Sequence, residues 1–473
     1  MTKGRLALAG LTSLLAGCPD GTSLDGDAID APDGDVSADH AEADRPPRED
    51  AGGGEALPEL LIFPPACGDG TIDPGEECDD RNRENGDECD WLCRLGPGTS
   101  DYPPPDESVG PLELSGEPVT VVPESEEAEG RWAVAWGTSH YGLAYQVVRP
   151  TPAVRFRVLD RNGTTVAGPV DLADAPGAAV SALVELPGGF GLLRSGPRVG
   201  YLTTLDSSGS PVGATSEIRR MPYEVSSSLV TGAATSTDRL YVRWTAISDD
   251  GSGVLLFDAL GLDGGSLGLS AAIDAGVDPS SAVSTVPVPL ADGFAAVVGF
   301  RVAVFDATLA LAGWSGILPA LPERGGPDAL VRTADGLLGM WLHVPTEGGY
   351  DLWAAGFDEL GELMVAPHVV EASLAGVVCY EGIAADAVPE GAVVAYVESR
   401  TDLCDSYELR VLNTDRWGWV RSPSVSVPID GIPTPSSSFV VTADDVGWSL
   451  WVMTRDPVER RPRLQFQRVL PSS

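Results

Sequence analysis

The chain has 473 residues and a net charge of −40. A chain of this length requires a modular or repeated architecture, because single hydrophobic cores stop growing at about 250–300 residues. The negative charge excludes nucleic acid and anionic lipid surfaces as default partners, since proteins bind both through Lys and Arg.

The first residues indicate export. Two basic residues precede an apolar run over residues 6–15, which is too short to span a bilayer and is typical of a secretory signal. The sequence LAGC at 15–18 resembles the lipobox of bacterial lipoproteins. That resemblance implies cleavage of a signal peptide (1–17), lipidation of Cys18 and anchoring to the cell envelope, at the outer membrane or cell surface. The alternative is an ordinary signal peptide with an incidental cysteine.

Residues 18–66 are expected to form a disordered tether. Between residues 19 and 66 there are 13 acidic and two basic residues, a net charge of −11, with Ala, Gly and Pro between them. High charge with few large apolar residues cannot offset the entropy of ordering, and like-charge repulsion extends such a segment.

A small cysteine module follows at 67–95. Its cysteines are spaced C-x10-C-x10-C-x3-C, and they are Cys67, Cys78, Cys89 and Cys93. Four cysteines in a short exported segment predict two disulfides, whose connectivity the sequence leaves open. A zinc site is the alternative, although no CxxC pair is present.

The module is similar to the Myxococcus cysteine-rich repeat. The resemblance rests on CGDG at 67–70, GEECDDRN at 75–82 and GDEC at 86–89. Arg81 and Glu88 stand where the family has glycine, so the turns at these positions differ. The resemblance implies an extracellular module of undefined function.

Oxygen-bearing side chains are concentrated within ten residues of this module. They are Asp79, Asp80, Asn82, Asn85, Asp87 and Glu88. Ca²⁺ takes six to eight such ligands, so the cluster predicts calcium as the one candidate cofactor. The alternative is that these residues form turns, because their spacing is not that of an EF-hand loop.

After a Pro- and Gly-rich linker (96–110), residues 111–473 form a repeat domain. Its unit is clearest at 181–218, where short alternating strands are separated by turns, with the fourth strand expected at 211–213. The first turn of the unit recurs seven times, at 129–130, 188–189, 238–239, 292–293, 335–336, 390–391 and 444–445. The third strand is expected to end at Asp160, Asp206, Asp306, Asp358, Asn413 and Leu470, and in the third unit at Asp258 or Asp263.

Seven turn signals about 43–59 residues apart predict an all-β fold, a seven-bladed β-propeller. A pair of β-sandwich domains is the alternative. The LDxxGxxVG pattern resembles repeats of propeller-like bacterial surface proteins, which implies no activity. The last unit lacks a fourth strand, and we expect 117–122 to supply it by pairing with 464–470.

Cys379 and Cys404 are the remaining cysteines, and both fall in the sixth unit. Cys379 is expected to begin the first strand and Cys404 to lie just beyond the second. These two points share one end of an antiparallel hairpin, so we predict a disulfide between them.

No catalytic motif is present: the sequence lacks GxSxG, HExxH and Walker patterns, and its four histidines have no metal-ligand spacing. Tryptophans at strand positions are expected in the core between blades. The favoured function is a non-catalytic surface lipoprotein, held at the membrane by its lipid, that binds an extracellular protein or glycan. The alternative is a propeller hydrolase or lyase acting on extracellular polysaccharide, with catalytic groups converging at the channel.

Overall fold

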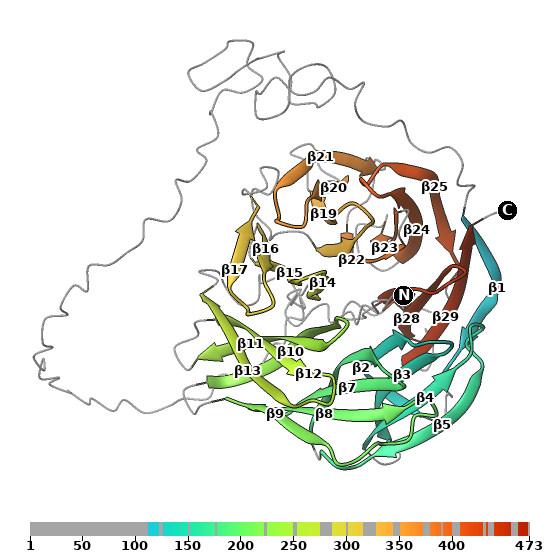
Figure 1. Ribbon diagram of the computed structural model, residues 1–473. Coiled ribbons are helices and arrows are strands. Elements are labelled where there is room, and N and C mark those ends of the chain that lie inside the picture. Colours follow the sequence, from blue (N-terminus) through green and yellow to red (C-terminus); the bar gives the residue numbers. More distant parts are fainter. Residues whose placement is uncertain are drawn as a thin grey trace, which may run out of the picture.

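The computed structural model describes residues 112–471, except for 123–125, 150–151, 176, 222–224, 249–252, 275–285, 299–300, 316–327, 344–350, 372–378, 389–390, 400–406, 429–431, 434–438 and 456–461. Every regular element of these residues is a β-strand, and no helix among them could cross a membrane. The strands form seven antiparallel sheets arranged in a ring (Figure 1). The predicted seven-bladed β-propeller is therefore confirmed.

The strands of each blade are named from the channel outward, first to fourth. Blade one comprises β2 (Glu127–Trp136), β3 (Tyr141–Arg149), β4 (Ala153–Leu159) and β5 (Thr165–Leu172). Blade two comprises β6 (Ala179–Leu186), β7 (Gly189–Ser195), β8 (Val199–Asp206) and β9 (Ser216–Arg220). Blade three comprises β10 (Val225–Thr235), β11 (Arg239–Ser248), β12 (Gly253–Gly261) and β13 (Ser266–Asp274). Blade four comprises β14 (Val288–Leu290), β15 (Gly293–Val298), β16 (Arg301–Phe305) and β17 (Leu311–Trp314).

Blade five comprises β18 (Ala329–Arg332), β19 (Leu337–His343), β20 (Asp351–Phe357) and β21 (Leu363–Glu371). Blade six comprises β22 (Cys379–Val388), β23 (Gly391–Ser399), β24 (Tyr407–Asp415) and β25 (Val420–Val427). Blade seven comprises β27 (Phe439–Ala443), β28 (Trp448–Arg455), β29 (Pro462–Pro471) and β1 (Leu112–Thr120), with the short β26 (Ile432–Pro433) also paired to β28.

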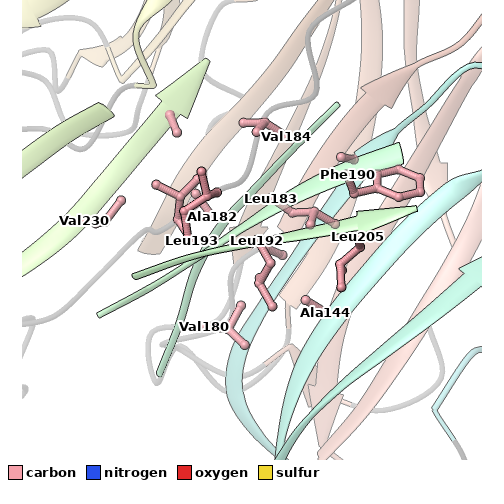
Figure 2. Packing of buried hydrophobic residues seen from close by; sticks show 14 of the residues in the cluster. Ala144, Val180, Ala182, Leu183, Val184, Phe190, Leu192, Leu193, Leu205 and Val230 are labelled. Carbon is pink, nitrogen blue, oxygen red and sulfur yellow. The ribbon is translucent and has the colours of Figure 1, made fainter. Parts of the chain in front are cut away.

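The core fills the spaces between blades. The innermost strands contact one another all round the ring, including β27 against β2 where the ring closes. Figure 2 shows one part of this core, in which Ala144 of blade one, Leu183 and Phe190 of blade two and Val230 of blade three belong to a single apolar cluster. Burial between neighbouring sheets is the main favourable term that holds such a ring together.

The third turn, which joins the third and fourth strands, has one design in blades one, two, four, five and six. In blade two the carboxylate of Asp206 accepts hydrogen bonds from the backbone N–H groups of Ser208 and Ser210 at 2.8 and 2.9 Å. Gly209 completes the turn with a φ of +83°. Blades one, four, five and six repeat these two hydrogen bonds at Asp160, Asp306, Asp358 and Asp415. These are the aspartates of the LDxxGxxVG pattern.

The third turns also pack against the preceding blade. A Cβ on Gly209 would lie 2.7 Å from the ring of Phe156 in blade one, so glycine is required there for space as well as for its positive φ. Blade four is the exception, because Leu309 takes the equivalent place with a φ of 64°. The Leu309 side chain is buried in the apolar cluster that contains Phe257 of blade three. It therefore fills the contact that glycine makes elsewhere.

The ring is closed by the N-terminal strand, as predicted. β1 pairs antiparallel with β29 from Leu112 opposite Pro471 to Thr120 opposite Gln465, and the backbone N–H of Val121 continues the pairing to Leu464. Figure 1 shows β1 as the outer strand beside β29. The strand begins five residues earlier than expected and contains a bulge between Ser115 and Val119.

Three expected boundaries were wrong. The first turn of blade one lies at residues 137–140, because residues 130–131 form a bulge inside β2 between Glu129 and Trp132. The fourth strand of blade two is β9, at 216–220; Pro211 has no N–H to donate and forms only an isolated bridge to Leu205. The third strand of blade six continues past Asn413 to Asp415.

Other details of the repeat agree with expectation. The remaining first turns lie between the first and second strands of their blades. One further expected boundary was wrong: the third strand of blade three ends at Gly261, which stands at the usual aspartate position, and not at Asp258 or Asp263. The six tryptophans expected in the core are all buried, namely Trp132, Trp136, Trp244, Trp341, Trp448 and Trp451.

Candidate functional site

The described interior holds several buried polar clusters, and three of them share one position in the repeat. Tyr145, Arg194 and Tyr396 lie on the second strands of blades one, two and six. In each of these blades one residue of the second strand pairs with the residue just before the third-turn aspartate. Tyr145, Arg194 and Tyr396 each lie four residues after that residue. Each also reaches a carboxylate from the segment that precedes the first strand of its own blade.

In blade one this carboxylate is Glu126. It accepts hydrogen bonds from the Tyr145 hydroxyl at 2.7 Å and from Arg157 Nη2 at 2.9 Å, and Arg155 Nη1 lies 3.2 Å away. Arg157 also donates to the Tyr145 hydroxyl, and Arg155 forms a second ion pair with Asp171 at 2.8 Å. Burial, and then the hydrogen bond to Glu126, raise the pKa of Tyr145 well above its ordinary value. Tyr145 thus stays protonated as a donor.

In blade two the corresponding group is the fully buried guanidinium of Arg194. Its Nη2 donates to Asp174 and to Thr203, both at 2.7 Å, and its Nη1 donates to the backbone carbonyl of Leu172 at 3.3 Å. Partial burial alone would raise the pKa of Asp174, but hydrogen bonds from Thr215 and Arg194 lower it below its ordinary value. Asp174 therefore remains an anion beside a matched cation.

Blade six repeats the arrangement with a tyrosine. The hydroxyl of Tyr396 donates to Glu371 at the end of β21, and Ser424 donates to the other oxygen of that carboxylate at 2.8 Å. Burial, followed by the hydrogen bond to Glu371, raises the pKa of Tyr396. Tyr396, like Tyr145, stays protonated and donates a hydrogen bond to a neighbouring carboxylate.

A fourth cluster joins blade seven to blade one. Asp444, in the first turn of blade seven, accepts two hydrogen bonds from Arg468 of β29 and one from the hydroxyl of Tyr141 at 2.9 Å. The backbone N–H groups of Val446 and Gly447 donate to the same carboxylate at 2.9 and 3.0 Å. Burial raises the pKa of Tyr141, with a further contribution from the charge of Asp444. The ring of Tyr141 packs against Trp136, Trp451 and Phe466.

The acidic and tyrosine side chains of these clusters already have partners within the protein. A general acid or base needs a pKa near the working pH and contact with a substrate proton. Glu126, Asp174 and Asp444 are instead ion-paired, Glu371 accepts hydrogen bonds from Tyr396 and Ser424, and the three tyrosines have raised pKa values. A polar group that recurs at one position in three blades is explained by the need to pair buried groups between sheets. Among residues 112–471, outside the gaps named above, no three His, Cys, Asp or Glu side chains are placed to hold a metal.

Most of the predicted site residues lie outside the described residues. These are Cys18, Cys67, Cys78, Cys89, Cys93, Cys404 and the proposed calcium ligands Asp79, Asp80, Asn82, Asn85, Asp87 and Glu88. Cys379 is described and begins β22, as predicted, opposite Ser399 at the end of β23. The connection that contains Cys404 starts directly after Ser399, and the Cys379–Cys404 disulfide stays a prediction.

The sequence did not reveal the four polar clusters, although one signal for them was present. Aligning the blades on the aspartate of the third turn places Tyr145, Arg194 and Tyr396 in register. Their acidic partners precede the first strands at variable distances, so no fixed spacing identifies them.

Comparison with known proteins finds only distant structural likenesses. No family model matches the chain, and no curated protein matches it. A Dyadobacter fermentans protein of unknown function is 11% identical, with a TM-score of 0.45, over 76% of this chain and 99% of that one. A subtype N10 neuraminidase-like protein of A/little yellow-shouldered bat/Guatemala is 9% identical, with a TM-score of 0.36, over 76% and 100%. A GH43_1 enzyme from Xanthomonas citri is 11% identical, with a TM-score of 0.31, over 75% and 90%. Likenesses at this level carry no argument about activity.

Proposed function

We propose that this protein is a non-catalytic surface lipoprotein whose propeller binds a protein or glycan outside the cell. The observation that carries the proposal is that the carboxylates of the four polar clusters are already paired within the protein. Glu126, Asp174, Glu371 and Asp444 are each engaged by arginine, tyrosine or hydroxyl donors from the protein itself. A propeller enzyme needs carboxylates or tyrosines that are free to meet a substrate.

The N-terminal segments supply the rest of the proposal. A lipid on Cys18 would hold the chain at the membrane, and the acidic tether between residues 18 and 66 would extend from it. The first described strand of the propeller begins at Leu112 and is the outer strand of blade seven, on the outside of the ring. Such a placement suits a binding module presented to the surroundings of the cell.

The anchor is tested by replacing the cysteine. We expect Cys18→Ser to move the protein from the detergent phase to the aqueous phase in a phase-partition assay of membranes, because the acyl chains are the proposed anchor. Cys379→Ser serves as the matched control, since it also removes one thiol and should partition like the wild type. Retention of Cys18→Ser in the detergent phase would contradict the anchor.

The non-catalytic role is tested on polysaccharides and a glycan array. We expect the mature chain to retain some glycans or an extracellular protein and to release no reducing ends on prolonged incubation. Tyr145→Phe, with Tyr396→Phe as its control at the equivalent position, asks whether any hydrolysis depends on the Glu126 cluster. Hydrolysis that Tyr145→Phe abolishes and Tyr396→Phe preserves would replace the binding role with the hydrolase alternative.

A further inference from the structure

Exposed apolar side chains recur at one place in five consecutive blades. They follow the third turn at the start of the fourth strand, except in blade two, where Val212 precedes β9, and each residue is between 45% and 55% exposed. We call this set the apolar rim: Val166, Val212, Leu267, Leu311 and Met364. Single exposed apolar residues are ordinary on protein surfaces. A set that recurs within one residue of the same position in successive repeats is not scattered, although Leu311 of blade four lies one residue earlier than the others. Part of its cause lies in the backbone.

β-Bulges aim several of these side chains outward. In blade one Leu159 pairs with Thr165 and Val158 with Ala167, so Val166 is the extra residue between them. Met364 is the extra residue in blade five, and Leu267 lies within the bulge of blade three. A bulge leaves its extra residue outside the ladder and redirects its side chain. The strand thereby presents to solvent a residue that would otherwise alternate into the core.

The surroundings of the apolar rim are acidic. The third turns of blades one, two, four and five carry Asp160, Asp206, Asp306 and Asp358, each five or six residues before a residue of the apolar rim. Hydrogen bonds from Ser208 and from Thr308 lower the pKa values of Asp206 and Asp306 respectively, which keeps both carboxylates charged.

The arginines in or directly beside the turns at this end are already matched by protein acids. Arg161 pairs with Asp445 at 2.5 Å and Arg416 pairs with Asp335 at 2.5 Å. Arg239 pairs with Asp238 at 3.0 Å. In blade six Arg421 is the extra residue of the bulge, the position that Val166 and Met364 occupy in blades one and five, so the apolar rim ends there.

Charge decides which partner fits this surface. A second copy of the chain would bring the same acidic turns, and the tether carries a net charge of −11, so both are repelled. Anionic lipid is repelled for the same reason. We propose that the apolar rim and the acidic third turns form a docking surface for a basic segment of a partner protein that bears apolar side chains. This deepens the proposed binding role and rests on it.

The test uses the full mature chain and two synthetic peptides as probes. One is an amphipathic Leu/Lys peptide, and the other is a Lys/Ser peptide with the same number of lysines. We expect the wild type to bind the Leu/Lys peptide at least about tenfold more tightly by fluorescence anisotropy, since about 1.4 kcal/mol of apolar contact accounts for that ratio. Raising the salt concentration should weaken both complexes.

The apolar rim is probed with a variant carrying Val166→Ser, Val212→Ser, Leu267→Ser and Met364→Gln. It should lose the preference for the Leu/Lys peptide. The control, Val119→Ser with Val369→Ser, changes exposed apolar residues of fourth strands that lie away from the third turns, and it should keep the preference. If the four-residue variant unfolds, Val166→Ser and Met364→Gln are measured singly, and each should lower the preference.

Several outcomes would overturn the docking surface. They are equal affinity for the two peptides, an unchanged preference in the rim variant, an equal loss in the control, and tighter binding to phosphatidylglycerol vesicles than to the Leu/Lys peptide. Any of them leaves the proposed binding role standing, because that role is judged by glycan and protein retention and by the absence of hydrolysis.

Discussion

Blade seven and blade four are held in the ring by different kinds of contact. Blade seven is assembled from both ends of the domain, and its junction with blade one contains the buried Asp444–Arg468 pair and the Tyr141 hydroxyl. Blade four has the short strands β14 to β17, and its junction with blade three is a stack of aromatic rings. Phe294 and Phe305 of blade four stack with their centroids 4.7 Å apart, and Phe257 of blade three lies beside both.

The difference follows from connectivity. Blade four follows blade three along the chain, and apolar contact dominates their junction, with one hydrogen bond from Arg239 to the backbone carbonyl of Ala307 at 2.7 Å. Blade seven must bring together segments more than 300 residues apart, with Tyr141 and Asp444 separated by 303 positions. Bidentate arginine–carboxylate pairing fixes geometry as well as contributing energy. The junction where the chain is discontinuous thus contains a buried ion pair in addition to its apolar contacts.

Removing the closing strand should have the largest effect on this comparison. Deletion of residues 1–123 takes away β1 and exposes the edge of β29, so we expect a loss of several kcal/mol in the free energy of unfolding, or aggregation. Deletion of residues 1–109 keeps β1 and should leave stability unchanged. Melting temperatures measured by circular dichroism compare the two, and equal values would contradict closure by β1.

Breaking the buried pair should come next. Asp444→Asn leaves Arg468 buried without its anion, which costs about 3–5 kcal/mol in urea unfolding. The double variant Asp444→Asn with Arg468→Met should recover part of this loss, because it removes the uncompensated charge. If the double variant is no more stable than the single one, the ion pair does not organise the junction.

Lowering the pH should weaken the junction at Asp444 but not the aromatic junction of blade four, and this effect on the unfolding free energy should be smaller than that of Asp444→Asn. Burial alone would raise the pKa of Asp444, but hydrogen bonds from Arg468 and from the Val446 N–H lower it below the ordinary value of 3.8. A carboxyl with a lowered folded-state pKa contributes stability above its unfolded pKa and loses it as the pH falls through the folded one. Unfolding free energies measured from about pH 5 to pH 2.5 should therefore fall less steeply in Asp444→Asn than in the wild type. Phe294→Leu in blade four, which changes no titrating group, should keep the wild-type slope.

The turn of blade four should give the smallest effect. Leu309→Gly loses about 1.5–3 kcal/mol of buried apolar contact but relieves about 1–2 kcal/mol of left-handed backbone strain, so the net loss should be about 1 kcal/mol. Gly209→Ala in blade two has no such offset, because the new Cβ meets the ring of Phe156. If denaturant midpoints show Leu309→Gly losing more than Gly209→Ala, strain at Leu309 is negligible.

The repeat could be predicted from the sequence because its turns are local. The aspartate of each third turn binds backbone groups two and four residues away, so residue type and spacing report the turn directly. The closing strand was predictable for a related reason. The sequence before blade one resembles the third turn and following residues of blade two, and the sequence of the last blade lacks a fourth strand. The bulge inside β2 was not predictable, because Glu129-Gly130 has the composition of a turn and becomes part of a strand only by pairing with β3.

What the sequence by itself determined is therefore the class of fold, the number of blades and the way the ring closes. Only the tertiary structure decided which polar groups meet. Asp444 reaches Tyr141, Glu126 reaches Arg157, and Glu371 reaches Tyr396, each across a separation that no local pattern encodes. The physical reason is range: turn geometry is settled within five residues, whereas a buried charge is compensated by whatever donor the packing of two sheets brings beside it.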